Sequence, residues 1–337
     1  MAVLKTKYMG IELKNPIIIG ASNLSDNIED AVKIEDAGAA AIVYKSLFEE
    51  QIELEKLQIS EQIEEYSERH AEMINIFPGI KNIGPQEHLF KLKKLRQALK
   101  IPLIASINAV SKGNWIDFAK KIEGTGVDGI ELNFYSVPSD INKTGTDIEK
   151  VHVDILKSIK KSISIPCSVK LSFFYSNALN VICSLDKAGA DGFVLFNKLF
   201  QPEIDVENVK YEYPHTHTCE HESKLPMRWT GLAFGNIDAD ICSSTGIYTG
   251  KDVIKMILSG ATCTQSVSAI YRYGANHITS MLNEINSWMD KNGFKEISDF
   301  KGKLSKKNVK DPYFYERAQY IDILLKNETI IKKDFMR

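Results

Sequence analysis

The sequence predicts a single closed barrel of eight parallel strands alternating with helices, a (β/α)8 TIM barrel. A length of 337 residues suits either one large barrel of this kind or two ordinary domains. A motif that consists of a helix end, a glycine and an apolar run occurs four times along the chain. No GxGxxG follows the first apolar run, which favours a closed barrel over an open dinucleotide-binding sheet.

Each copy of the motif predicts a helix followed by a buried strand. A helix ends readily on glycine, because glycine adopts the left-handed conformation that satisfies the last carbonyls. The apolar run that follows lacks polar alternation, as expected of a parallel strand covered on both faces. The copies begin near Glu35, Glu123, Asp186 and Leu258 and contain Gly38, Gly126, Gly189 and Gly260.

Four more strands complete the expected eight. They are predicted at residues 15–22, 101–109, 165–172 and 228–235. Apolar residues at helical spacing occupy the segments between strands. One such stripe is Trp115, Phe118, Ala119 and Ile122, and another is Ala178, Val181, Ile182 and Leu185.

Two long stretches interrupt the alternation. Residues 47–92 form a charged insertion with helical character, and residues 199–227 form a polar excursion. Both follow the carboxyl end of a strand, the side on which barrel enzymes build their active sites. No Gly/Ser-rich linker divides the chain, so we expect one barrel over residues 1–304. Residues 305–337 are expected to be a helical extension that packs on the barrel or on a second subunit.

Composition excludes several classes of partner. The hydrophobic share of 44% and the charged share of 26% are typical of a globular protein. A net charge of 42 − 44 = −2 gives no field that would attract nucleic acid or an anionic membrane. No apolar run reaches the roughly 20 residues of a membrane span, and no signal peptide is recognisable, so we expect a cytoplasmic protein. The five cysteines contain no CxxC pair, which argues against an iron–sulfur cluster or a disulfide framework.

The predicted strand ends bring polar side chains to one mouth of the barrel. Carboxylates are nearly absent from these ends, which disfavours a magnesium site or a glycosidase pair. An asparagine at such a position can simply hold a loop, but two lysines indicate an anionic ligand because burying an ammonium is costly. The strand-end residues are Ala21, Ser22, Asn23, Lys45, Ser46, Asn108, Asn133, Phe134, Tyr135, Ser136, Lys170 and Asn197.

A second group of residues follows the last two strands. Thr245 and Gly246 precede a helix expected near Gly250, and the last strand ends at Val267 and Ser268. Loops after strands seven and eight of a barrel commonly hold a phosphate with backbone N–H groups. Such a site suits a phosphorylated cofactor lying over the mouth, although the glycines could also serve only as turn residues.

These motifs resemble the dihydroorotate dehydrogenase family, in particular its soluble class and a branch of related proteins, over about residues 8–304. The resemblance implies an FMN barrel, most simply a homodimer, that moves two electrons through the flavin of a small-molecule oxidoreductase. Residues that it implies in flavin binding are Ala21 and Ser22 in GAS, Lys45 and Ser46 in YKS, Asn108, Asn133 in ELNF, Lys170 in SVKLS, Thr245 with Gly246, and Val267 with Ser268. Lys170 would stabilise negative charge on the reduced flavin.

The substrate loop departs from the family pattern. The family has NxSCPN, and this chain has NFYSVP, which puts Ser136 on the position of the proton-abstracting base and Tyr135 beside it. A serine needs help to act as a base, and Tyr135 could instead act as a general acid. Lys45 is the third candidate catalytic residue. Asn133 and Asn197 match substrate-binding amides, but Pro138 replaces another, and the NSMGLPN loop has no counterpart. Oxidation of dihydroorotate in pyrimidine biosynthesis is the leading named reaction.

Two other functions stay open at this point. A flavin-free lyase or aldolase could use Lys170 or Lys45 as a Schiff-base amine. A non-catalytic metal-binding barrel is the other alternative, because alternate residues of an extended strand point to one side and imidazole and thiolate bind zinc. The residues concerned are His215, His217, Cys219 and His221. Their spacing differs from familiar zinc motifs, and we predict no metal.

Overall fold

The computed structural model describes residues 2–48, 85–108, 112–135, 137–198, 201–212 and 217–325. Eight parallel strands close into a barrel in the order β11-β12-β3-β4-β5-β6-β7-β8, which confirms the predicted fold class. The strands are β3 (Ile17–Ser22), β4 (Ala41–Phe48), β5 (Leu103–Asn108), β6 (Gly129–Phe134), β7 (Cys167–Leu171), β8 (Gly192–Leu195), β11 (Asp240–Ser244) and β12 (Cys263–Ser266).

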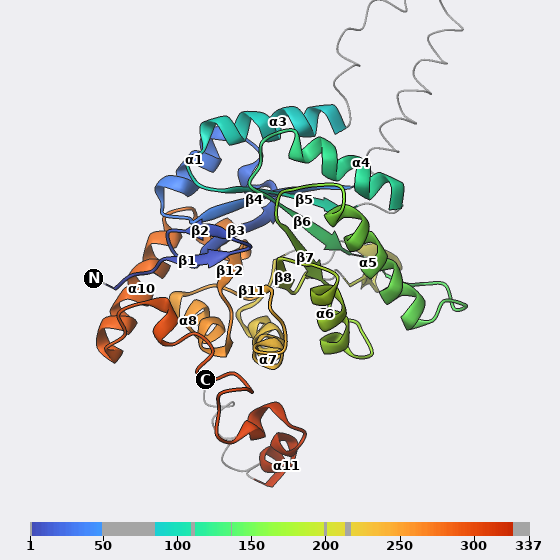
Figure 1. Ribbon diagram of the computed structural model, residues 1–337. Coiled ribbons are helices and arrows are strands. Elements are labelled where there is room, and N and C mark those ends of the chain that lie inside the picture. The colour runs from blue at the N-terminus through green and yellow to red at the C-terminus, as the bar shows by residue number, and fades with distance from the viewer. Residues whose placement is uncertain are drawn as a thin grey trace, which may run out of the picture.

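Helices form a ring around these strands (Figure 1). They are α1 (Ile28–Asp36), α3 (Pro85–Ala98), α4 (Lys112–Glu123), α5 (Gly145–Lys160), α6 (Ala178–Lys187), α7 (Lys224–Ala233), α8 (Gly250–Ser259) and α10 (His277–Asn292). The short helices η1 (Asn23–Ser25) and α9 (Ser268–Tyr273) lie directly after β3 and β12. Both predicted apolar stripes are buried against the barrel, on α4 and α6.

The glycines of the recurring motif have the backbone conformation that the sequence analysis predicts. Gly38, Gly126, Gly189 and Gly260 have φ angles of +109°, +83°, +99° and +124°. Each ends a helix in a conformation that side chains rarely adopt, and the next strand begins within a few residues.

The strand predicted at residues 228–235 is wrong. That segment belongs to helix α7, and the seventh barrel strand is β11, which begins at Asp240. Aromatic and β-branched residues such as Trp229 and Thr230 favour a strand locally, but their packing here is helical. The Thr230 hydroxyl lies 2.7 Å from the Ser243 hydroxyl, which attaches α7 to β11. Gly231 lets the ring of Tyr315 pack directly on the backbone of this helix, since a Cβ at that position would overlap the ring.

An N-terminal hairpin closes the amino-terminal end of the barrel. Its strands are β1 (Thr6–Tyr8) and β2 (Ile11–Leu13), and its turn buries Tyr8 and Met9. A Cβ on Gly192 would lie 2.9 Å from atoms of both side chains, so β8 accepts the hairpin only with glycine there. The Met9 N–H donates to Asp240 Oδ2 at 3.0 Å. The hairpin therefore covers the end of the barrel opposite to the carboxyl ends of the strands.

The two predicted interruptions follow β4 and β8 in the chain. Most of the first, residues 49–84, lies outside the described residues, and α3 forms its last part. The second contains a hairpin of β9 (Glu203–Asp205) and β10 (Lys210–Glu212), followed by the 3-10 helix η4 (Glu220–Ser223).

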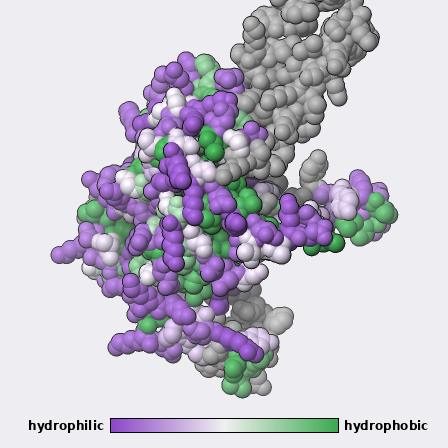
Figure 2. All heavy atoms as spheres, turned by 45° about the vertical axis from the view of Figure 1, so that its right-hand side comes forward, coloured by the Kyte–Doolittle hydropathy of each residue, from purple (hydrophilic) through white to green (hydrophobic). Residues whose placement is uncertain are grey.

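The C-terminal segment contains η5 (Ile297–Asp299), η6 (Pro312–Tyr315) and α11 (Ala318–Leu325). The Tyr315 hydroxyl donates to the Leu304 carbonyl, which fixes η6 beside α7, whereas α11 lies outside the ring (Figure 1). Hydrophobic side chains are exposed at this end of the molecule (Figure 2). The domain boundary at residue 304 stays a prediction. None of the helices in the described residues has the length and apolarity to span a bilayer.

Candidate active site

A cavity of about 1000 Å³ opens at the carboxyl ends of the barrel strands. It brings together most of the residues that the sequence singles out, from seven of the barrel strands and the loops that follow them. The predicted residues that line it are Ala21, Ser22, Asn23, Lys45, Ser46, Asn133, Tyr135, Lys170, Asn197, Thr245, Gly246, Val267 and Ser268. Among the described residues, no carboxylate lines this cavity. Ser136 lies outside the described residues, so its predicted role as the base stays a prediction.

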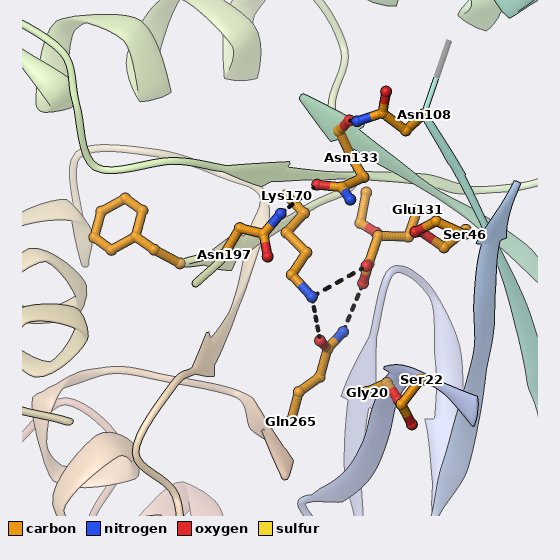
Figure 3. A network of polar contacts seen from close by, with 12 residues as sticks. Gly20, Ser22, Ser46, Asn108, Glu131, Asn133, Lys170, Asn197 and Gln265 are labelled. Atoms are coloured by element: carbon orange, nitrogen blue, oxygen red, sulfur yellow. Dashed lines mark hydrogen bonds and ion pairs between the residues drawn. The ribbon is translucent and has the colours of Figure 1, made fainter. Parts of the chain in front are cut away.

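Lys170 lies at the base of the cavity in a buried polar network (Figure 3). Its ammonium is 3.4 Å from Gln265 Oε1 and 3.7 Å from Glu131 Oε1. Gln265 Nε2 donates to Glu131 Oε2 at 2.6 Å, and Glu131 is 1% exposed. Both contacts of the ammonium are long, so it keeps hydrogen-bonding capacity toward the cavity. Glu131 neutralises a charge that would otherwise be costly to bury.

The amide of Asn133 is oriented by its neighbours. Asn197 Nδ2 donates to Asn133 Oδ1 at 2.8 Å (Figure 3), which leaves the Asn133 amino group as the donor available to a ligand. Asn108 supports the loop that lines the cavity. Its Nδ2 donates to the carbonyls of Asn133 and Tyr135 at 2.9 and 3.3 Å. Asn108 is therefore placed to hold the loop after β6, and it does not line the cavity.

Lys45 is anchored by Asp26, a residue that the sequence analysis missed. Lys45 Nζ lies 2.7 Å from Asp26 Oδ1, and Lys91 Nζ lies 3.5 Å from the same oxygen. The Tyr44 hydroxyl also donates to this oxygen at 3.3 Å. The hydrogen bond from Lys45 is the main cause that holds the pKa of Asp26 below its ordinary value. Only the polar composition of the segment after β3 hints at a site there.

The turn after β11 has an unusual backbone. Thr245 has a φ of +82° and Gly246 a φ of +73°. A positive φ is costly for a β-branched residue, and the Thr245 hydroxyl offsets part of this by donating to the Phe196 carbonyl at 2.8 Å. A Cβ on Gly246 would overlap the backbone of Ser223, so this position requires glycine. The turn thus passes close between η4 and the cavity.

The polar excursion after β8 supplies a wall of the cavity. Thr218 bonds through its N–H and its hydroxyl to the Ser268 hydroxyl, each at 3.0 Å. The Tyr248 hydroxyl donates to the Thr218 carbonyl, and Lys198 Nζ donates to the His217 carbonyl at 2.6 Å. The sequence placed this excursion at the mouth, but no pattern in it identified Thr218 or His217 as lining residues.

The predicted histidine and cysteine cluster is only partly described. His217 lines the cavity with its ring 5.4 Å from that of Tyr271, and His215 lies outside the described residues. Within the part of the chain that the structure describes, no three His, Cys, Asp or Glu side chains form a group that could hold a metal ion.

The arrangement is suited to a polar, anionic ligand. Lys45, Lys170 and Lys198 line one cavity together with amides and hydroxyls. Lys45 lies 2.7 Å from a carboxylate oxygen of Asp26, and Lys170 lies 3.7 Å from one of Glu131. Each ammonium is therefore held in place beside a carboxylate, and a Schiff-base role for either lysine would require it to leave that pair.

Comparison with known proteins gives consistent matches. The family model described as dihydroorotate dehydrogenase matches residues 3–214. The catalytic subunit of dihydroorotate dehydrogenase B (NAD(+)) from Thermoplasma acidophilum is 27% identical, over 90% of this chain and 99% of that protein. The protein of the same name from Methanocaldococcus jannaschii is 25% identical, over 85% and 94%. Dihydroorotate dehydrogenase A (fumarate) from Lactobacillus delbrueckii subsp. bulgaricus is 28% identical, over 67% and 76%.

Proposed function

The chain belongs to the dihydroorotate dehydrogenase family and is an oxidoreductase that acts on a CH–CH bond, and on that premise we propose that it uses FMN to oxidise dihydroorotate to orotate. The observation that carries the proposal is the cavity at the mouth of the barrel. It combines a buried ammonium, an oriented amide pair and a glycine turn, and no carboxylate from the described residues lines it.

The residues present fit FMN. Lys170, nine-tenths buried with only long contacts, can meet negative charge on a flavin ring, and Lys45 lies in the same cavity. Thr245, Gly246 and Ser268 line the end of the cavity that would hold the phosphate, since Gly246 has no side chain to shield its backbone from a ligand. When bound, the flavin supplies the two-electron acceptor.

The chain itself binds and orients the substrate. The Asn133 amino group, fixed by Asn197, donates to a carbonyl oxygen of the substrate ring. The lysines attract the substrate carboxylate. The proton beside the carbonyl is taken by Ser136 or Tyr135. Tyr135→Phe and Ser136→Ala separate the two, because loss of turnover at unchanged flavin content identifies the residue that moves the proton.

The electron acceptor lies outside this chain. Its relatives include catalytic subunits named for NAD(+) and an enzyme named for fumarate. We propose the catalytic-subunit role, in which electrons leave the flavin for a partner subunit, because more of the chain aligns with those relatives. The homodimer implied by resemblance is the alternative, and co-purification from the native source distinguishes them.

The first experiment is to identify the cofactor of the purified protein. We expect a yellow protein that releases FMN on denaturation and turns over dihydroorotate with a dye as acceptor. Lys170→Met should keep much of the flavin and lose most of the turnover. A colourless protein in which borohydride traps a carbonyl compound on Lys170 would instead establish the lyase alternative.

A further inference from the structure

A second cavity of about 420 Å³ lies outside the barrel, between the ends of β6 and β7 and helix α5. It shares no lining residue with the cavity of about 1000 Å³ at the mouth of the barrel, which we name the flavin cavity. The segment after β6 separates the two, because Tyr135 lines the flavin cavity whereas Phe134 and Val137 line the second one. In the ring of helices, α5 lies between α4 and α6 (Figure 1). The volume is that of a small-molecule site.

A buried histidine forms the floor of this second cavity. His152 is 8% exposed, and its ring is stacked on Phe134 with centroids 4.3 Å apart and planes at 5°. Its Nδ1 lies 3.4 Å from the Tyr175 hydroxyl. Its Nε2 has no hydrogen-bond partner among the described residues. Burial lowers the pKa of His152 to about 4, so the ring is neutral at physiological pH. A ring nitrogen without a protein partner can pair with a ligand or a water in the cavity.

The second cavity has apolar residues at its edge, and its charge is opposite to that of the flavin cavity. Phe174 and Val137 are 54% and 65% exposed at its edge, which leaves apolar surface available to a flat ligand. Glu149 is the one charged side chain among the lining residues, and it forms no ion pair within the described residues. A negative group without an ion-pair partner in the described part of the chain disfavours anions such as the substrate carboxylate or a phosphate, and it favours an amino or N–H donor.

We propose that this second cavity is a binding site for a small planar heteroaromatic molecule that carries an amino or N–H donor. Its ring lies between Phe174 and Val137, its donor edge binds the Glu149 carboxylate, and one ring atom or substituent pairs with His152 Nε2. The site is separate from the flavin cavity, so the proposal does not depend on the identity of the oxidised substrate.

The test is calorimetric titration of the full-length holoprotein with 2-aminobenzimidazole, with benzofuran-2-carboxylate as a planar anion of similar size that has no N–H donor. We expect one site with a dissociation constant of about 1 mM or tighter for the amine, from its roughly ten non-hydrogen atoms, and no binding of the anion. Glu149→Gln should weaken the amine at least tenfold. Asp154→Asn, on an exposed position of the same helix, should leave its affinity unchanged.

Two more variants make the result decisive. His152→Phe keeps the stacked ring but removes Nε2, and should also weaken the amine. Lys45→Met, in the flavin cavity, should not change its affinity. The proposal is overturned if the amine gives no binding, if Glu149→Gln binds it as tightly as the unmodified protein, or if Lys45→Met alters its affinity. Glu149 is only half-buried, so its variant should fold even if His152→Phe does not.

Discussion

Replacement of Asp26 by asparagine tests how the protein positions Lys45. Asp26 Oδ1 accepts from Lys45 at 2.7 Å, and Lys91 and the Tyr44 hydroxyl lie 3.5 and 3.3 Å from the same atom. Asparagine has nearly the same shape but no charge. In Asp26→Asn, Lys45 loses the anion that holds it at the wall of the flavin cavity. We therefore expect weaker catalysis with an intact fold.

The size of the effect follows from partial exposure of the pair. The side chains of Lys45 and Asp26 are 32% and 39% exposed. Fully exposed pairs contribute about 0–1 kcal/mol, and breaking a buried pair costs about 3–5 kcal/mol. An intermediate value of about 1.5 kcal/mol corresponds to roughly a tenfold loss. We expect kcat/KM for dihydroorotate to fall about tenfold per bound flavin.

The control is Asp30→Asn. Asp30 and Lys33 form a pair of the same length, 2.7 Å, on the exposed side of α1. We expect this variant to keep kcat/KM within about twofold, as surface pairs usually do. Steady-state assays and the rate of flavin reduction measure both variants. If Asp26→Asn retains full activity, or if the two variants lose equally, Asp26 does not position Lys45 for catalysis.

Three further predictions concern stability and the loop after β6. Since the pKa of His152 is about 4 in the folded protein and 6.5 ordinarily, the unfolded state takes up its proton first as pH falls. Between about pH 6.5 and 4 this costs on the order of 3 kcal/mol, and urea midpoints should fall less with acid in His152→Phe. An equal acid response in both proteins would contradict this. Gly126→Ala meets no atom within 4 Å and should cost about 1 kcal/mol, whereas Gly246→Ala, with its backbone overlap, should cost at least twice as much and lower flavin content. Equal unfolding free energies would refute that distinction. Asn108→Ala removes the two bonds to the Asn133 and Tyr135 carbonyls, and should reduce turnover without releasing flavin; unchanged turnover would show that these bonds do not hold the loop.

The sequence predicts the barrel well because its signals are local. A glycine with positive φ, such as Gly189, and a short apolar strand after it depend on a few neighbouring residues. The seventh strand is the exception, because its position does not follow from local sequence signals. The segment around Trp229 has strand-like composition, but Gly231 lets Tyr315 pack on a helix there, and that contact joins residues 84 positions apart (315 − 231). Long-range packing of this kind leaves no local pattern.

In the site, too, some residues follow from local sequence signals and others depend on long-range contacts. Lys170, Asn133 and Asn197 stand at strand ends, and closing the barrel brings strand ends together. Asp26 could not be predicted, because it acts through Lys45, which lies 19 positions further along the chain (45 − 26). Glu131 lies on β6 in the same ELNF motif as Asn133, but its side chain contacts Lys170 only because β6 and β7 pair in this register.

Anaerobic titration of the bound flavin with dihydroorotate tests the central claim most directly. The lysines, the amide pair and the glycine turn of the flavin cavity are proposed to hold this substrate and FMN together, so that two electrons pass from the substrate to the flavin. We predict that the flavin absorbance near 450 nm, to be followed in an ordinary spectrophotometer, bleaches with about one equivalent of substrate and that orotate is formed in equal amount. Flavin that stays oxidised with excess dihydroorotate, yet is bleached by dithionite, would contradict the account of the substrate.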